Sequence, residues 1–132
     1  MTKHFKIKYN VPYSEMYCEV DSSDYIIIPL DENSTYDNTY RTYKVSGSVQ
    51  LSYGFLKPAI ISEEFSQFYS FDNKNSLIYN KSSLYYALKK AILLNNNEYK
   101  KLQNNLYTTE KKIYKTSFDN VKKSLRNQKA LN

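Results

Sequence analysis

Short apolar runs alternate with polar, helix-like segments through the first 80 residues. The runs are residues 25–30 (YIIIPL), 59–61 (AII) and 77–79 (LIY), and the first two are rich in β-branched side chains. Continuous apolar runs of this length are typical of strands buried on both faces, as in a parallel sheet. We therefore predict parallel strands at Tyr25–Leu30, Ala59–Ser62 and Leu77–Tyr79.

Two further elements are expected before the first buried strand. Apolar side chains alternate with lysines in residues 4–9 (HFKIKY), which indicates a strand with one apolar face. After Pro12, apolar positions recur at helical spacing as far as Val20. Since strand 4–9 lacks sheet neighbours before it in the chain, we expect it at an exposed edge or paired with a second copy of the chain.

The middle of the chain predicts a loop followed by a compact helix. Residues 31–45 are polar and show no clean period, so they are expected to form a surface loop. The helix begins at Ser46 and ends before Pro58. Residues 63–71 predict a further helical turn.

Three helices are expected in the C-terminal part of the chain. Ser82 or Ser83 is placed to cap the first. The triplet Asn95–Asn97 interrupts the pattern before the second, and the third begins near Thr116 or Ser117.

The alternation of strands and helices predicts an α/β domain with a Rossmann-like, mostly parallel sheet and flanking helices. A length of 132 residues is that of one domain. We expect a β/α core in residues 1–80 and C-terminal helices in residues 81–132. Cys18 is the only cysteine, and no apolar segment is long enough to span a bilayer, so we expect a cytoplasmic protein.

The net charge of +6 is concentrated at one end of the chain. Residues 81–132 contain twelve Lys and Arg against three acidic residues, whereas residues 1–80 carry a net charge of −3. The basic stretch could be a solvated helical face, or it could contact nucleic acid or anionic lipid.

The candidate chemistry lies at the start of the helix after the loop. Ser46, Gly47 and Ser48 place two hydroxyls and a glycine where unpaired N–H groups and the helix dipole favour an anion such as a diphosphate. Arg41 and Lys44 lie just before them and could neutralise phosphate. The alternative is that Ser46 is an ordinary N-cap and both cations are solvated. With one histidine and one cysteine, no metal site or metal cofactor is predicted.

Four segments appear in a familiar order: VPYSEMY, DSSDYIIIPL, SGSVQLSYGFLKPAII and SLIYNKSSLYYALKKAI. This order resembles the second, nucleotide-sugar-binding domain of GT-B glycosyltransferases in the group 1, family 4-like superfamily. The resemblance implies a partial C-terminal GT-B domain in which Ser46, Gly47 and Ser48 contact the donor diphosphate, assisted by Arg41 or Lys44. Its donor would be a nucleotide sugar, and a sugar would pass to a glycan, lipid or polysaccharide acceptor.

Three departures from the family pattern bear on this resemblance. Leu56 replaces the usual glycine, and Leu51 replaces the glutamate that would bind the ribose. Glu63 or Glu64 could substitute for that glutamate, or they could equally cap the next turn. The acceptor-binding domain and two earlier βα units are missing, so we expect a fragment, a truncated product or a chain that pairs with another, inactive alone. Self-association and contact with the inner membrane face are also expected.

The alternative function is a non-enzymatic, basic interaction protein. In that interpretation the lysine-rich helices after Lys81, with exposed tyrosines, bind nucleic acid or an anionic surface. Lysines opposite a leucine stripe are also what any surface helix needs, so nucleic acid is the less favoured partner.

Overall fold

The centre of the protein is a three-stranded parallel sheet. A computed structural model describes residues 6–31, 33–42, 44–80 and 83–129. Its strands are β1 (Ile26–Ile28), β2 (Ala59–Ser62) and β3 (Leu77–Tyr79), in the spatial order β1-β2-β3. The three parallel strands predicted from the apolar runs are confirmed. β1 is shorter than predicted, and it ends before Pro29, which has no N–H group to donate to a neighbouring strand.

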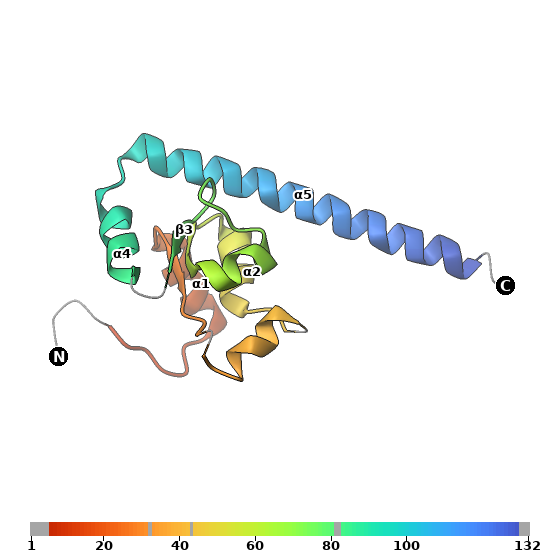
Figure 1. The fold of residues 1–132 in the computed structure, drawn as a ribbon, viewed down its shortest axis with the longest axis horizontal. Coiled ribbons are helices and arrows are strands. Elements are labelled where there is room, and N and C mark those ends of the chain that lie inside the picture. Colours follow the sequence, from red (N-terminus) through yellow and green to blue (C-terminus); the bar gives the residue numbers. More distant parts are fainter. Residues whose placement is uncertain (1–5, 32, 43, 81–82, 130–132) are drawn as a thin grey trace.

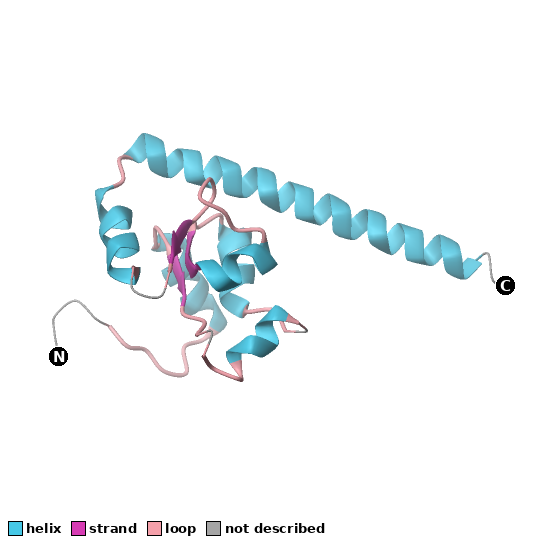
Figure 2. Ribbon diagram, viewed as in Figure 1, coloured by secondary structure: helices cyan, strands magenta, loops and turns pink. Residues whose placement is uncertain are grey.

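Helical segments surround this sheet on both faces (Figure 2). They are α1 (Tyr13–Ser22), η1 (Asp37–Arg41), α2 (Gly47–Phe55), α3 (Glu63–Ser66), η2 (Gln67–Tyr69), α4 (Leu84–Leu93) and α5 (Asn96–Lys129). The helices predicted after Pro12 and after Ser46 are confirmed, as is the helical turn in residues 63–71. The predicted loop 31–45 contains the short 3-10 helix η1.

Alternate residues of β2 contribute to two separate apolar clusters. Ala59 and Ile61 pack in one cluster with Val49 of α2, whereas Ile60 packs in the other with Ala87 of α4. This alternation arises because successive side chains of a strand point to opposite faces of the sheet. All four residues of β2 are buried, which agrees with the expectation for a central parallel strand.

Helix α5 crosses the sheet at the amino ends of its strands. Leu106 packs in the first cluster and Leu102 in the second, so the helix bridges both layers. Three of its side chains donate hydrogen bonds to carbonyl oxygens within three residues of a strand's start: Tyr99 to Asp24 (2.8 Å), Gln103 to Leu56 (3.1 Å) and Asn105 to Lys74 (2.8 Å). The opposite, carboxyl ends of the strands lead into loops and short helices.

A single helix replaces the two helices predicted after residue 95. Asn95 Oδ1 accepts hydrogen bonds from the amides of Asn97 and Glu98, and Glu98 Oε2 accepts one from the Asn95 amide. This reciprocal cap starts the helix firmly. The predicted break at Thr116 or Ser117 is wrong. Proline ends a helix because it has no N–H group and clashes with the preceding turn, whereas threonine and serine do neither. The C-terminal half of the helix extends away from the rest of the molecule (Figure 1).

The strand predicted at residues 4–9 is not formed over Lys6–Tyr9, while His4 and Phe5 lie outside the described residues. Ile7 and Tyr9 are 60% and 82% exposed, so the apolar face of the predicted strand has nothing to pack against. Lys8 instead forms ion pairs with Glu15 and Glu19. These pairs tie the segment to α1 and not to the sheet.

Leu56 ends α2 in the left-handed region, at φ 52° and ψ 40°. Glycine adopts this conformation without steric cost, whereas a residue with a Cβ does not. This is the position at which the glycosyltransferase pattern has glycine.

Replacing Leu106 by alanine should lower the free energy of unfolding by about 2–5 kcal/mol, because this side chain is fully buried between α5 and the sheet. Leu125→Ala on the same helix is the matched control, and it should change stability by less than about 0.5 kcal/mol because Leu125 is 55% exposed. Urea unfolding followed by circular dichroism measures both. Equal losses would contradict the packing of α5 described above.

Candidate ligand-binding site

The carboxyl ends of the three strands meet around a shallow cavity. Ligands of open α/β sheets bind at this edge. The cavity has a volume of about 290 Å³ and is lined by Pro29, Leu30, Asp31, Asn33, Ser62, Glu64 and Tyr79. Each strand therefore contributes residues at its end or just beyond it, and most of the polar lining groups are hydrogen-bond acceptors or hydroxyls.

Ser62, the last residue of β2, is the cavity residue whose bonding is incomplete. It is 6% exposed, and its Oγ is buried with no hydrogen-bond partner among the described residues. An unsatisfied buried polar group costs about 1–3 kcal/mol. A ligand hydroxyl in the cavity would remove this cost.

Two carboxylates give the cavity an acidic character. The burial of Tyr79 raises the pKa of its phenol, and the negative charges of Glu64 and Asp31 raise it further. Asp31 is held in place by its neighbours: its Oδ1 accepts hydrogen bonds from the backbone and side-chain amides of Asn33, and its own backbone amide donates to Asp37 Oδ2. The cavity therefore favours O–H and N–H donors and disfavours phosphate.

The sequence-predicted anion site lies at the start of α2. The amides of Val49 and Gln50 donate to the carbonyl of Ser46, so helical bonding begins there. The amides of Gly47 and Ser48 belong to the first turn, where a helix provides no acceptor. A Cβ added to Gly47 would meet nothing within 4 Å, so open space faces this turn.

Ser46 itself differs from the expected anion ligand. It occupies the N-cap position, but its side chain makes no capping hydrogen bond. A hydrogen bond from its backbone lowers the pKa of the Tyr69 phenol, against the larger opposite effect of burial. The Tyr69 hydroxyl thus lies near one of the backbone groups expected to face a diphosphate.

Arg41 and Lys44 are both held on aromatic rings. The Arg41 guanidinium lies 4.7 Å from the ring centroid of Phe65, and its Nε is buried without a hydrogen-bond partner in the described part of the chain. The Lys44 ammonium lies 4.2 Å from the ring of Tyr36. Cation–π attraction therefore replaces the solvation that isolated loop cations would have. Their charge still raises the potential beside α2, but either side chain would have to leave its ring to touch phosphate.

A chain of tyrosines fixes the loop and α2 against η2. The Tyr53 hydroxyl donates to the carbonyl of Tyr69, and the Tyr69 hydroxyl donates to the carbonyl of Tyr40, both at 2.7 Å. Tyr53 also stacks on Phe71, with ring centroids 4.9 Å apart. Burial, and to a lesser extent Asp72, raises the pKa of Tyr53.

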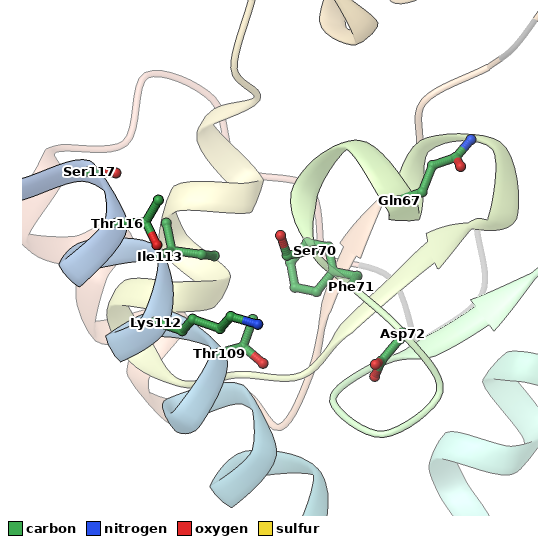
Figure 3. A pocket seen from close by; sticks show the side chains of 9 residues that line it. All are labelled: Gln67, Ser70, Phe71, Asp72, Thr109, Lys112, Ile113, Thr116 and Ser117. Carbon is green, nitrogen blue, oxygen red and sulfur yellow. The ribbon is translucent and has the colours of Figure 1, made fainter. Parts of the chain in front are cut away.

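A larger hollow of about 550 Å³ lies between α5 and residues 67–72 (Figure 3). Figure 3 shows Lys112 and Thr109 of α5 on one side, and Ser70 and Asp72 on the other. The Thr109 hydroxyl already bonds to Asn75 and to the carbonyl of Asn105. Because no lining group described here is both buried and unbonded, this hollow is the weaker candidate.

No protein-family model, curated protein or solved structure matches this chain. The glycosyltransferase resemblance therefore remains a prediction. Within the described ranges, no three His, Cys, Asp or Glu residues gather in a way that could hold a metal ion.

Sequence reasoning missed most of the cavity. Asp31, Ser62 and Tyr79 were not singled out from the sequence as ligands. Glu64 was considered, as a substitute ligand for a ribose. One feature of the sequence could have indicated these residues: a polar residue stands at or directly after the end of each predicted strand.

Tyr53→Phe should reduce the loss of stability at alkaline pH. Because its pKa is raised, the Tyr53 phenol keeps its proton in the folded protein at a pH above about 10, where the unfolded chain releases it. The free energy of unfolding therefore falls as the pH rises past that value. Chemical unfolding between about pH 9 and pH 11 should give a shallower decline for the variant, which is also less stable at neutral pH through loss of one hydrogen bond. An unchanged slope would show that Tyr53 does not titrate abnormally.

Proposed function

We propose that this domain binds a nucleotide sugar at the carboxyl edge of its sheet, as the donor-binding part of a glycosyltransferase. The observation that carries the proposal is the buried Ser62 hydroxyl without a partner, in an acidic cavity at the ends of all three strands. The order of sequence segments supplies the chemical class.

The charges at the carboxyl ends of the strands favour a ligand that has a hydroxyl-rich part and a phosphate part. Sugar hydroxyls would donate to the carboxylates of Asp31 and Glu64 and bond to Ser62, because carboxylates accept hydrogen bonds strongly. The same carboxylates repel phosphate. The diphosphate would therefore lie at the amides of Gly47 and Ser48, where the helix dipole is favourable.

Catalysis in this proposal depends on stabilising the leaving diphosphate. Preorganised amides at the start of α2 would meet the charge that develops as the sugar departs. A second domain, on the same polypeptide or on another chain, would bind the glycan, lipid or polysaccharide acceptor. The domain described here would bind its donor without turnover.

The proposed setting is the cytoplasm, with contact at the inner membrane face. Across the described ranges, no helix combines the length and the apolar character needed to cross a bilayer. Peripheral contact would bring a lipid-linked acceptor to the donor site.

Glu64→Gln should weaken the binding of a nucleotide sugar about tenfold, because a carboxylate that accepts from sugar hydroxyls is replaced by a neutral amide. Glu63→Gln is the matched control, since Glu63 is exposed and does not line this cavity. Calorimetric titration with UDP-, GDP- and ADP-sugars, and with the corresponding nucleoside diphosphates, gives both affinities. Glu64→Gln should leave nucleoside diphosphate affinity unchanged, and an equal loss for the two variants would contradict a sugar in the cavity.

Gly47→Val should reduce the affinity for nucleoside diphosphates at least tenfold by covering the first-turn amides. The added side chain has room, so the variant should fold normally. Gly54→Val, also with open space around the new Cβ, controls for a valine within α2. If Gly47→Val binds diphosphates as well as the parent protein, the phosphate does not lie at this helix start.

A further inference from the structure

We infer that the outward face of α5 is a docking surface for an anionic lipid bilayer, a function separate from the donor site. Between Lys111 and Asn127 the sequence has six basic residues and one acidic residue. The described residues of this stretch are all exposed. An exposed helix face with a strong excess of one charge attracts a partner surface of opposite charge.

An apolar stripe runs along this part of the helix. Tyr114, Phe118, Val121 and Leu125 are 67%, 49%, 57% and 55% exposed. Their spacing of four, three and four residues places them on one side of an α-helix. The rings of Tyr114 and Phe118 are stacked, with centroids 6.2 Å apart, so the stripe is continuous there.

A line of lysines borders the stripe. Lys100, Lys111 and Lys122 are spaced eleven residues apart, so each is rotated by about 20° from the one before, and together they span about 33 Å of helix. Lys111 and Lys122 lie over the rings of Tyr107 and Phe118, at 4.4 Å and 4.5 Å. These lysines extend the aromatic surface and carry their charges beside it.

The rest of the molecule does not obstruct this face. Leu102 packs in the apolar core, and Lys100 and Lys111 lie about 160° and about 180° around the helix from it. The globular part therefore lies behind the N-terminal half of α5, and the C-terminal half extends past it (Figure 1). A flat partner can contact the helix from its first turns to its last.

These features favour a lipid surface over other partners. A second copy would bring the same positive charge against its own, and the stripe is shorter than the three to four heptads of a coiled coil. Nucleic acid would be contacted by the lysines and rings, but it gives no burial to Val121 and Leu125. A bilayer accepts apolar side chains at the depth of its headgroups and attracts flanking lysines to anionic lipid.

A tryptophan reporter tests the orientation of the helix. The chain has no tryptophan, so Phe118→Trp introduces a single fluorophore on the stripe. Its emission should shift to the blue on vesicles of phosphatidylcholine with about 40% phosphatidylglycerol, and not on phosphatidylcholine alone. Asn120→Trp, about 160° around the helix, should show no shift. Equal shifts, or none, would overturn the inference.

Two pairs of matched variants test the chemistry by vesicle co-sedimentation. Lys115→Ser with Lys122→Ser should weaken binding roughly ten- to thirty-fold, since each lysine near an anionic surface contributes about a factor of five. Lys89→Ser with Lys90→Ser removes the same charge from α4 and should change binding less than about threefold. Equal losses would overturn the inference, because they would indicate attraction by net charge alone.

In the second pair, each double variant adds two negative charges. One variant places them on the apolar stripe and the other places them on the opposite face of the helix. Val121→Asp with Leu125→Asp should weaken vesicle binding at least tenfold more than Asn120→Asp with Asn127→Asp. Circular dichroism checks that the helix persists, and the Phe118→Trp emission gives an independent result if it does not. Preferential binding of a single-stranded oligonucleotide without vesicle binding, or a dimer by light scattering that produces the fluorescence shift without lipid, would overturn the inference.

Discussion

Burial of β2 on both faces is the constraint on which the other elements depend. Its neighbours β1 and β3 each leave one edge unpaired, so β2 is the strand that parallel pairing and packing enclose completely. Ala59 and Ile61 require α2 on one face, and Ile60 requires α4 on the other. Helix α5 then joins the two layers by placing Leu106 in one and Leu102 in the other. In a sheet of three strands, this bridging helix supplies burial that further strands would otherwise provide.

The position of α5 also decides where a ligand can bind. Its hydrogen bonds to carbonyls before each strand occupy the amino edge. Loops and helix N-termini lie at the carboxyl ends of the strands. There the acidic side chains and the groups that favour anions occupy different positions. Asp31 and Glu64 make one part acidic, while the start of α2 provides unpaired amides. The proposed nucleotide sugar, whose sugar hydroxyls lie to one side of its diphosphate, would match this division.

The two proposed surfaces lie at different parts of the molecule. The donor site is at the carboxyl edge, whereas the lysines of α5 face away from the globular part at the other edge. Their chemistry differs too, since the donor site combines a carboxylate-lined cavity with helix amides, whereas the α5 surface combines an apolar stripe with lysines. Both surfaces can therefore be occupied at once, and a change in either need not disturb the other.

The sequence by itself determined the strands, their parallel arrangement and most helices, because burial on both faces imposes a continuous apolar run. It also placed the helix start at Ser46. Tertiary structure decided the remainder. Ile7 and Tyr9 alternate correctly for a strand but have no surface to cover, and Thr116 and Ser117 suggest a helix start that a continuing helix overrides. Arg41 lies over the ring of Phe65, and Ser62 is buried at the end of β2, through contacts between segments distant in the chain. Local patterns do not contain such contacts, so the acidic cavity became visible only when the three strand ends were brought together.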